Sequence, residues 1–367
     1  MFDAEVWARV PFHFWSVVFF VFGCIVGSFL NVCIYRMPLG QSVVSPPSHC
    51  PHCNYSIPWY LNMPLVTWLY LRGKCANCRA PISPRYFLVE LLTGVVFLVC
   101  WLLAGHQSAW LALIYCLFMA GLIVATFIDL EHFIIPDEIT IGGIVVGFVC
   151  SIFVTGMHGE VELMSRAGKS ILGIAVGGGL IYLVLRLGKL MFGRHHVALE
   201  PASKIIFTET MLVLPDGNIP YEEIFYRKSD VLKMDAGRVE LCDRCYWNVP
   251  VEISLMSSLL KIGEEELKPE EVTHMEVTTD KLVVPREAMG LGDVKFMAAI
   301  GAFLGWQAVV FSLAVSSFIG AAVGVTIIAL KKHERSGRIQ YGPCIAAAAA
   351  IWVFGGYRWW QMLFPGR

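Results

Sequence analysis

Two aspartates lie far apart in the chain, each at a boundary between apolar and polar sequence. Asp129 ends an apolar run, and Asp293 follows Gly290 and Gly292 directly before another apolar run. A carboxylate at the edge of the hydrocarbon is costly unless it is partnered or functional, and the two glycines permit close approach of a substrate strand. If the aspartates meet, one can activate water while the other, protonated, polarises a scissile carbonyl, as in aspartic proteases. A helix N-terminal carboxylate is the structural alternative for Asp293.

Six of the twelve cysteines form three C-x-x-C pairs. Two of these pairs lie close enough in sequence to bind one tetrahedral ion through four thiolates: Cys50, Cys53, Cys75 and Cys78. Such a site has no open position, so we expect a structural Zn²⁺ in a segment that, at about 50 residues, lacks a sufficient core of its own. Free thiols or a redox pair are the alternative. The third pair, Cys242 and Cys245, has no partner pair, and ordinary cysteines or a redox pair are expected there.

The elements that position these residues are predicted from composition. The chain has 367 residues, of which 56% are hydrophobic and 16% charged, whereas globular domains are about 45–50% apolar and about 25% charged. This composition excludes a disordered chain and a small disulfide scaffold, and the net charge of −1 gives no reason to expect nucleic-acid binding. We therefore expect an all-α polytopic membrane protein with about eight transmembrane helices.

The apolar runs divide the chain into five regions. Runs close to the ~20 residues needed for a span lie at about 12–35, 86–104, 109–128, 138–156, 169–191, 291–304, 307–330 and 342–364, the sixth being short. We predict a first transmembrane helix, a four-cysteine segment, helices 2–5, a strand-rich insert and helices 6–8, in residues 1–35, 36–85, 86–191, 192–286 and 287–367. Strand-like runs in the insert include 204–207 and 211–214.

Lysine and arginine in the short loops predict the orientation. The loops at 36–85 and 331–338 are both rich in these residues, and with eight spans they share one side, which we expect to be the cytoplasm. The insert and the two loops that carry the aspartates, 129–137 and 287–293, fall on the same side. Both termini then face outward.

Several of these motifs together resemble the type IV prepilin peptidases, which are bifunctional leader peptidases and N-methyltransferases. Residues 27–36, Gly-Ser-Phe-Leu-Asn-Val-Cys-Ile-Tyr-Arg, are similar to the first-helix signature of the family, and the four cysteines follow in the expected loop. Residues 85–94 resemble the start of its second helix. Asp129 with Pro136 and Asp137 resembles the first catalytic motif, and the G-x-G-D sequence that ends at Asp293 resembles the second.

The resemblance implies that Asp129 and Asp293 are the catalytic pair of an aspartic endopeptidase. It implies cleavage after glycine of the basic leaders of type IV prepilins or pseudopilins, at the cytoplasmic face of the bacterial inner membrane. It also implies N-methylation of the new terminus with S-adenosylmethionine. Gly73 matches a position that the family associates with methylation, although a turn glycine before the second cysteine pair is the structural alternative.

For substrate binding, the resemblance adds roles to residues near the catalytic pair. Basic leader residues can be drawn to acidic groups such as Glu131 and Asp137, and a substrate strand can lie against Gly290 and Gly292. Pro136 also predicts a helix start with Asp137 in its first turn, a structural role for this carboxylate. The apolar helix of the substrate can dock against the spans within membrane lipid. The resemblance also makes pilus or secretion assembly proteins expected partners.

The chain departs from the family pattern in its insert of 95 residues, which stands where the family has a short connection. The insert can cover the site, dock assembly proteins or decorate the surface. Two other functions stay open: a presenilin-like intramembrane aspartic protease, and a metal-handling transporter. The first leaves the four-cysteine segment unexplained, and the second predicts mid-span polar residues that are few here. No Rossmann-type glycine motif appears, so the sequence does not predict the methyl-donor pocket.

Overall fold

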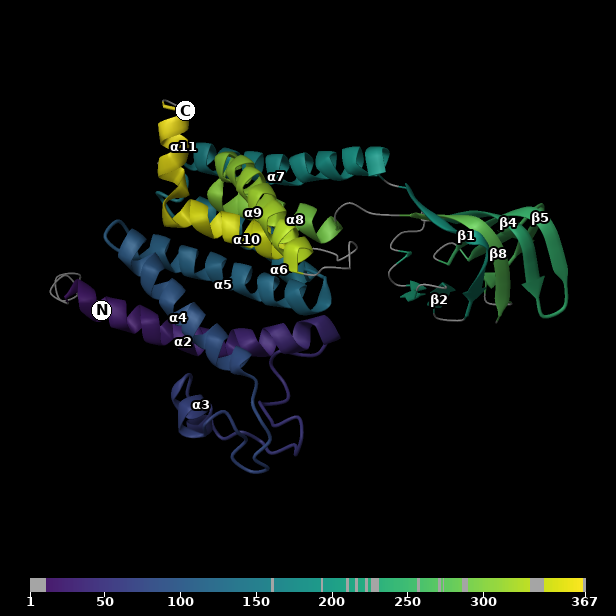
Figure 1. The fold of residues 1–367 in the computed structure, drawn as a ribbon. Helices are drawn as coiled ribbons and strands as arrows, with labels where there is room; N and C mark the ends of the chain where they lie inside the picture. Colours follow the sequence, from purple (N-terminus) through teal and green to yellow (C-terminus); the bar gives the residue numbers. More distant parts are fainter. Residues whose placement is uncertain are drawn as a thin grey trace. The chain divides into compact units, whose positions relative to one another are not determined.

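The computed structural model describes residues 11–159, 162–192, 194–208, 211–214, 217–221, 224–225, 231–255, 258–269, 272, 274–285, 290–330 and 340–365. The chain forms two compact units. One consists of Met1–Tyr182 with Leu291–Arg367 and is helical, and the other is Leu183–Gly290, which contains the strands (Figure 1). The basic loop predicted at 331–338 lies outside the described residues.

The helical unit contains long helices joined mostly by short connections (Figure 1). The main helices are α2 (Phe12–Arg36), α4 (Pro84–Ala104), α5 (Ala109–His132), α6 (Asp137–Phe153), α7 (Leu163–Phe192), α8 (Leu291–Leu304), α9 (Trp306–Leu330), α10 (Gly342–Ile351) and α11 (Tyr357–Leu363). A π-helical turn, Trp352–Gly356, joins α10 to α11, and α7 continues into the second unit. Between α2 and α4, the chain forms short helical turns at Met37–Leu39, Trp59–Leu61 and α3 (Val66–Tyr70).

Among the described residues, five helices are long and apolar enough to cross a membrane: Phe12–Leu39, Pro84–Ala104, Ala109–His132, Leu163–Leu190 and Trp306–Leu330. The polytopic helical character predicted from composition is thereby supported. The other three predicted spans are also helical but shorter. Helix α6 has 17 residues and α8 has 14, hence about 25 and 21 Å at 1.5 Å per residue, against a core of about 30 Å. The remaining one bends at Gly355, so a count of eight spans stays a prediction.

Glycines allow the helices to approach closely. A Cβ added to Gly23 of α2 would lie 2.8 Å from the Cα of Gly94 in α4, and one added to Gly27 would lie 2.8 Å from the Cα of Glu90. Helices in lipid gain no strong hydrophobic driving force from association, so close backbone contacts of this kind supply much of the attraction between them. Asn31 strengthens this pair, because its Nδ2 donates to the Tyr86 carbonyl across 3.0 Å.

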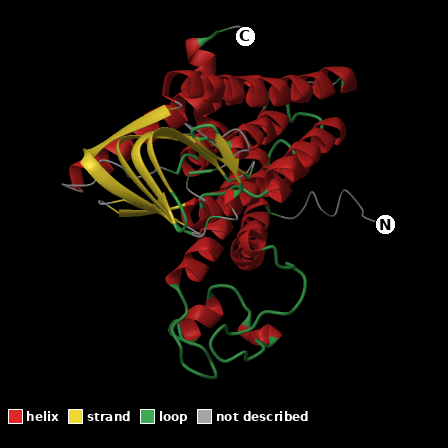
Figure 2. Ribbon diagram, turned by 90° about the vertical axis from the view of Figure 1, so that its right-hand side faces the viewer, coloured by secondary structure: helices red, strands yellow, loops and turns green. Residues whose placement is uncertain are grey.

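The second unit contains one antiparallel sheet in the order β3-β2-β1-β8-β4-β5-β6-β7. Figure 2 shows its strands in yellow. Its strands are β1 (Arg194–Phe207), β2 (Met211–Leu214), β3 (Gly217–Pro220), β4 (Leu232–Leu241), β5 (Cys245–Ser254), β6 (Leu259–Ile262), β7 (Glu265–Leu267) and β8 (Met275–Pro285). Alternate residues of β4, such as Leu232 and Met234, are buried in its core, as period-two strands require. The predicted strand-rich insert is therefore confirmed.

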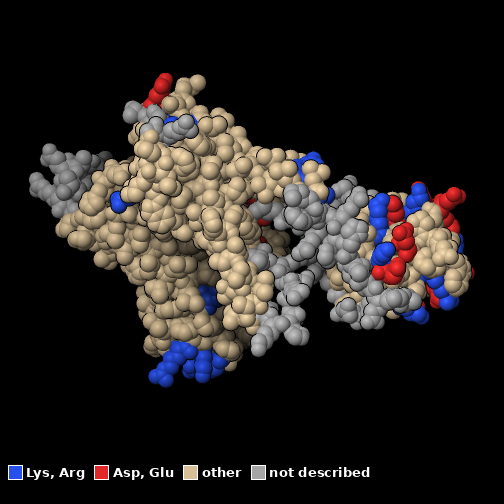
Figure 3. All heavy atoms as spheres, turned by 45° about the horizontal axis from the view of Figure 1, so that its top comes forward, with Lys and Arg blue, Asp and Glu red and all other residues tan. Residues whose placement is uncertain are grey.

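Charged side chains are distributed unevenly over the described surface. Figure 3 shows dense blue and red atoms on the strand unit and few on the helical unit. The exposed side chains of the helices are largely apolar, for example Val17 at 63% and Phe318 at 77%. A surface of this kind suits lipid rather than water, in agreement with the composition.

Candidate active site and metal centre

Asp129 lies in the last turn of α5 and is only 7% exposed. Its Oδ2 accepts a hydrogen bond of 3.1 Å from the backbone N–H of Gly342, the first residue of α10. Next to it, Gln340 Nε2 donates to the carbonyl of Leu130 across 3.1 Å. The start of α10 therefore fixes the carboxylate from one side. Among the described residues, Oδ1 of Asp129 has no hydrogen-bond donor.

Asp293 lies in the first turn of α8 and is half-buried. The preceding Gly292 packs against Ile135, because an added Cβ would lie 3.5 Å from the Ile135 Cβ. Ile135 also packs against Gly342, where an added Cβ would lie 3.2 Å from its Cδ1 and 2.6 Å from Oδ2 of Asp129. The structure thus packs Gly342, which holds Asp129, and Gly292, which directly precedes Asp293, against the same side chain. A water shared by both carboxylates stays a prediction.

The acidic residues predicted to attract a basic leader already have partners. Glu131 forms an ion pair with Arg85 from the start of α4. Asp137 is the first residue of α6, as its proline predicts, and its Oδ1 accepts a hydrogen bond of 2.6 Å from Lys295 of α8. Both pairs are partly exposed, so their contribution to stability is about 0–1 kcal/mol each. Leader cations would therefore have to compete with Arg85 and Lys295.

The four predicted cysteine ligands converge. One Sγ atom from each of Cys50, Cys53, Cys75 and Cys78 lies within 4.8 Å of every other, and two Sγ pairs are 3.8 and 4.0 Å apart. A tetrahedral ion with metal–sulfur bonds of about 2.3 Å requires sulfur–sulfur distances of about 3.8 Å. The cluster can therefore hold a metal ion with little rearrangement.

The local backbone explains this geometry. In the first knuckle Cys50 N–H donates to the Tyr55 carbonyl, and in the second Cys75 N–H donates to the Ala80 carbonyl, at 3.0 and 2.8 Å. The backbone N–H groups of Cys78 and Asn77 lower the pKa of the Cys75 thiol to about 6, whereas desolvation and the neighbouring thiols raise the pKa of Cys78 to about 11. Because the thiolate is the metal-binding form, Cys75 is ready to bind near neutral pH, while a metal ion would have to displace the proton of Cys78.

Gly73 lies in the turn between α3 and the second knuckle, with a positive φ of 67°. Its N–H donates to the Trp68 carbonyl across 2.9 Å, and an added Cβ would lie 2.9 Å from Cζ2 of the Trp68 indole. The residue thus has the structural role that the sequence offered as the alternative, and a role in methylation stays a prediction. The exposed Cys242 and Cys245 flank the β4–β5 turn in the other unit.

Two family models match separate parts of the chain. The model of the bacterial peptidase A24 N-terminal domain matches residues 21–104, and the model of the type IV leader peptidase family matches residues 116–198 and 255–325. The chain belongs to the type IV leader peptidase family. Both aspartates lie in the residues matched by the leader peptidase model, and all four clustered cysteines lie in those matched by the N-terminal model. Residues 199–254 of the insert lie outside both.

Individual relatives in the type IV leader peptidase family agree. The prepilin leader peptidase/N-methyltransferase of Aeromonas hydrophila is 29% identical over 97% of this chain and 96% of its own length. The proteins of the same name from Dichelobacter nodosus and Myxococcus xanthus are 35% and 40% identical, over 48% and 49% of this chain and 68% and 57% of their own lengths. No solved structure gives a significant match. The predicted family and enzyme class are thus confirmed.

The burial of Arg36 does not follow from the sequence. This arginine begins the polar segment 36–85, which predicts a loop cation, but its side chain is only 7% exposed at the end of α2. A detectable signal was its position: like Asp129, Arg36 ends an apolar run. The partners Arg85 and Lys295 were also missed, because their pairing depends on helix packing.

Proposed function

We propose that this chain cleaves the leaders of type IV prepilins or pseudopilins after glycine, at the cytoplasmic face of the bacterial inner membrane, and then methylates the new N-terminus. The observation that carries the peptidase activity is the junction at Ile135, against which pack both Gly342, the partner of the buried Asp129, and Gly292 of the G-x-G-D turn. Family membership supports the reaction, and the apolar helices support the membrane location.

In the proposed cleavage, Asp129 and Asp293 act on one water molecule. One carboxylate accepts a proton as the water oxygen attacks the scissile carbonyl, while the other, protonated, donates to the carbonyl oxygen. The tetrahedral intermediate then collapses, and the leaving nitrogen takes a proton as the peptide bond breaks. Gly342 holds Oδ2 of Asp129 through its N–H, which leaves Oδ1 available to the water.

In the proposal, the substrate is recognised at the membrane boundary that carries the two aspartates. The extended segment around the scissile bond lies along Gly290 and Gly292, where no side chain obstructs a second backbone. Glu131 and Asp137 exchange their intramolecular cations for those of the leader. The substrate's apolar segment stays in lipid against the helices. The part of the insert outside both family models is the surface left for assembly proteins.

The two proposed activities divide between the regions of the chain. Residues 86–191 and 287–367 carry the peptidase, and residues 1–85 serve methyl transfer. The four cysteines would hold a structural Zn²⁺, which would fix the loops of residues 36–85, where the short helical turns bury no residue. S-adenosylmethionine, when bound, would supply the methyl group that the freed α-amine of the substrate accepts, and the amine would lose a proton to water.

The test is incubation of the purified chain with a prepilin and isotopically labelled S-adenosylmethionine, followed by mass analysis of the mature N-terminus. We expect a product cut after the leader glycine that carries one labelled methyl group on its α-amine. An uncut substrate would refute the peptidase assignment. A cut product without the label would refute the methyltransferase assignment alone.

A further inference from the structure

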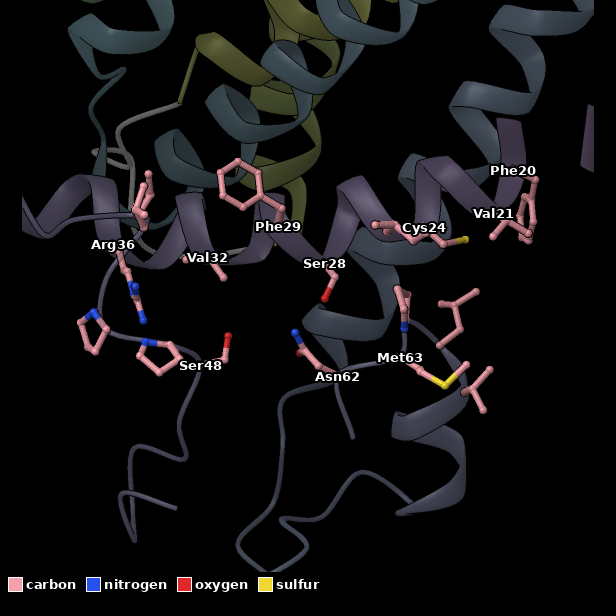
Figure 4. Close-up of a pocket in the computed structure, with 18 residues that line it drawn as sticks. Phe20, Val21, Cys24, Ser28, Phe29, Val32, Arg36, Ser48, Asn62 and Met63 are labelled. Carbon is pink, nitrogen blue, oxygen red and sulfur yellow. The ribbon is translucent and has the colours of Figure 1, made fainter. Parts of the chain in front are cut away.

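A cavity of about 620 Å³ lies between α2 and two loop stretches of the four-cysteine segment, Val43–Ser48 and Asn62–Val66. Its size is typical of small-molecule sites. Most of its lining is apolar, and one face of α2 supplies eight of the eighteen lining residues. The polar groups are few and project from both walls: Figure 4 shows Ser28 and Arg36 on α2, with Asn62 and Ser48 on the facing loops.

Arg36 gives this cavity its chemical preference. The guanidinium lines the cavity although the residue is only 7% exposed, and its Nη1 donates to the Ser42 carbonyl across 3.0 Å. In the described part of the chain, no carboxylate lies within ion-pair distance of it. A buried charge without a counter-ion costs several kcal/mol. Arginine presents a planar fork of donors that matches a carboxylate or phosphate, so an anionic ligand group is expected here.

A second buried ionisable group adjoins the opposite wall. Glu90 of α4 is 9% exposed, and its Oε2 accepts a hydrogen bond of 2.7 Å from the N–H of Leu65, which lines the cavity. No cation among the described residues is within ion-pair distance of Glu90. Glu90 itself does not line the cavity, but behind Leu65 its carboxyl group would favour a cationic centre in a ligand bound against that wall. A phospholipid phosphate matches Arg36 alone.

We infer that this cavity is the S-adenosylmethionine site, with the donor's carboxylate bound to Arg36. The inference rests on the methyl transfer of the proposed function. The donor is zwitterionic, with a carboxylate, an amine and a sulfonium, and its adenine can lie on the apolar lining that α2 contributes. The cavity also lies within residues 20–66, almost wholly inside the N-terminal family model and separate from the peptidase model that holds both aspartates.

With the donor in this cavity, Gly73 acts on methylation indirectly, through Trp68. Gly73 packs on the indole of Trp68 in α3, and the N-terminal end of α3, Leu65 and Val66, lines the cavity. A side chain at Gly73 would push the indole and with it the cavity wall. Gly73 is thus a positioning residue for the donor site.

The experiment measures binding of radiolabelled S-adenosylmethionine to the purified full-length protein, and locates the donor by ultraviolet cross-linking and peptide mapping. Arg36→Gln should weaken binding about tenfold or more, the usual effect of losing a charge-assisted hydrogen bond. Arg72→Gln is the matched control, because Arg72 is exposed on the same segment and does not line the cavity. Zinc content and thermal unfolding check that each variant is folded.

A second variant covers the case in which Arg36→Gln does not fold. Val32→Trp fills the cavity from α2 and should abolish binding, whereas Val17→Trp, at an exposed position of the same helix, should not. Cross-links within residues 20–66 support the inference. Cross-links confined to the peptidase residues, or full binding by both cavity variants, overturn it while leaving methyl transfer intact. A wild-type chain that neither binds nor transfers the methyl group refutes the proposed methyltransferase itself.

Discussion

Gly342 offers a sharp test of how Asp129 is held, because its N–H bonds Oδ2 and its Cα faces the carboxylate. In Gly342→Ala, the new Cβ would lie 2.6 Å from Oδ2 and 3.2 Å from Cδ1 of Ile135. Carbon and oxygen do not pack that closely, so the carboxylate must move by about half an ångström or more. A misplacement of 1 Å can cost about 100-fold in rate, so we expect kcat/KM for leader cleavage to fall about 10- to 100-fold.

The assay is the initial rate of mature product formation from a full-length prepilin, at substrate concentrations below KM. The predicted fall corresponds to about 1.4–2.7 kcal/mol in the activation free energy. Overpacking should also lower the free energy of unfolding by about 1–3 kcal/mol, which thermal unfolding would detect. Gly179→Ala in α7 is the matched control, since its added Cβ meets no atom within 4 Å. A folded Gly342→Ala enzyme with wild-type cleavage would refute the assigned role of Asp129.

Three further perturbations test other parts of the account. Purified protein should contain one zinc ion per chain, and Cys50→Ser should lose it. The affinity of the four cysteines for zinc should fall as the pH falls, because protons compete for the thiolates. Folded wild-type protein without zinc would contradict the metal assignment. Gly73→Val, strained at its positive φ and pressed against Trp68, should reduce N-terminal methylation more than cleavage, and equal losses would argue against it. Asp137→Asn should change the free energy of unfolding by less than about 1 kcal/mol, because its pair with Lys295 is exposed. Asp137→Lys should raise KM for a basic leader, and an unchanged KM would dismiss leader binding there.

Local sequence patterns predicted what depends on neighbours along the chain. The cysteine spacing predicted one four-sulfur cluster, because each knuckle closes through backbone hydrogen bonds within a few residues of its cysteines. Pro136 predicted the start of α6 for the same reason. The strand-rich insert followed from its change of composition, although the order of its strands, with β8 between β1 and β4, depends on long-range pairing.

Patterns along the chain did not reveal contacts that depend on how helices pack. The pairing of Glu131 with Arg85, and of Asp137 with Lys295, requires the ends of separate helices to meet. A polar segment begins at Arg36, so the sequence predicts no burial for this residue. Its burial arises because residues 42–48 fold back over the end of α2, which no spacing rule predicts. The junction at Ile135 likewise depends on the packing of α5, α8 and α10.

The most direct test of the central claim replaces each aspartate and measures leader cleavage and methylation separately. Asp129→Asn and Asp293→Asn should each reduce prepilin cleavage on the order of a thousandfold or more, since neither carboxylate can replace the other in moving protons. The same variants should still methylate a synthetic pilin that lacks its leader, which would show that they are folded. Measurable leader cleavage by either variant at a rate near wild type would contradict the proposed pair.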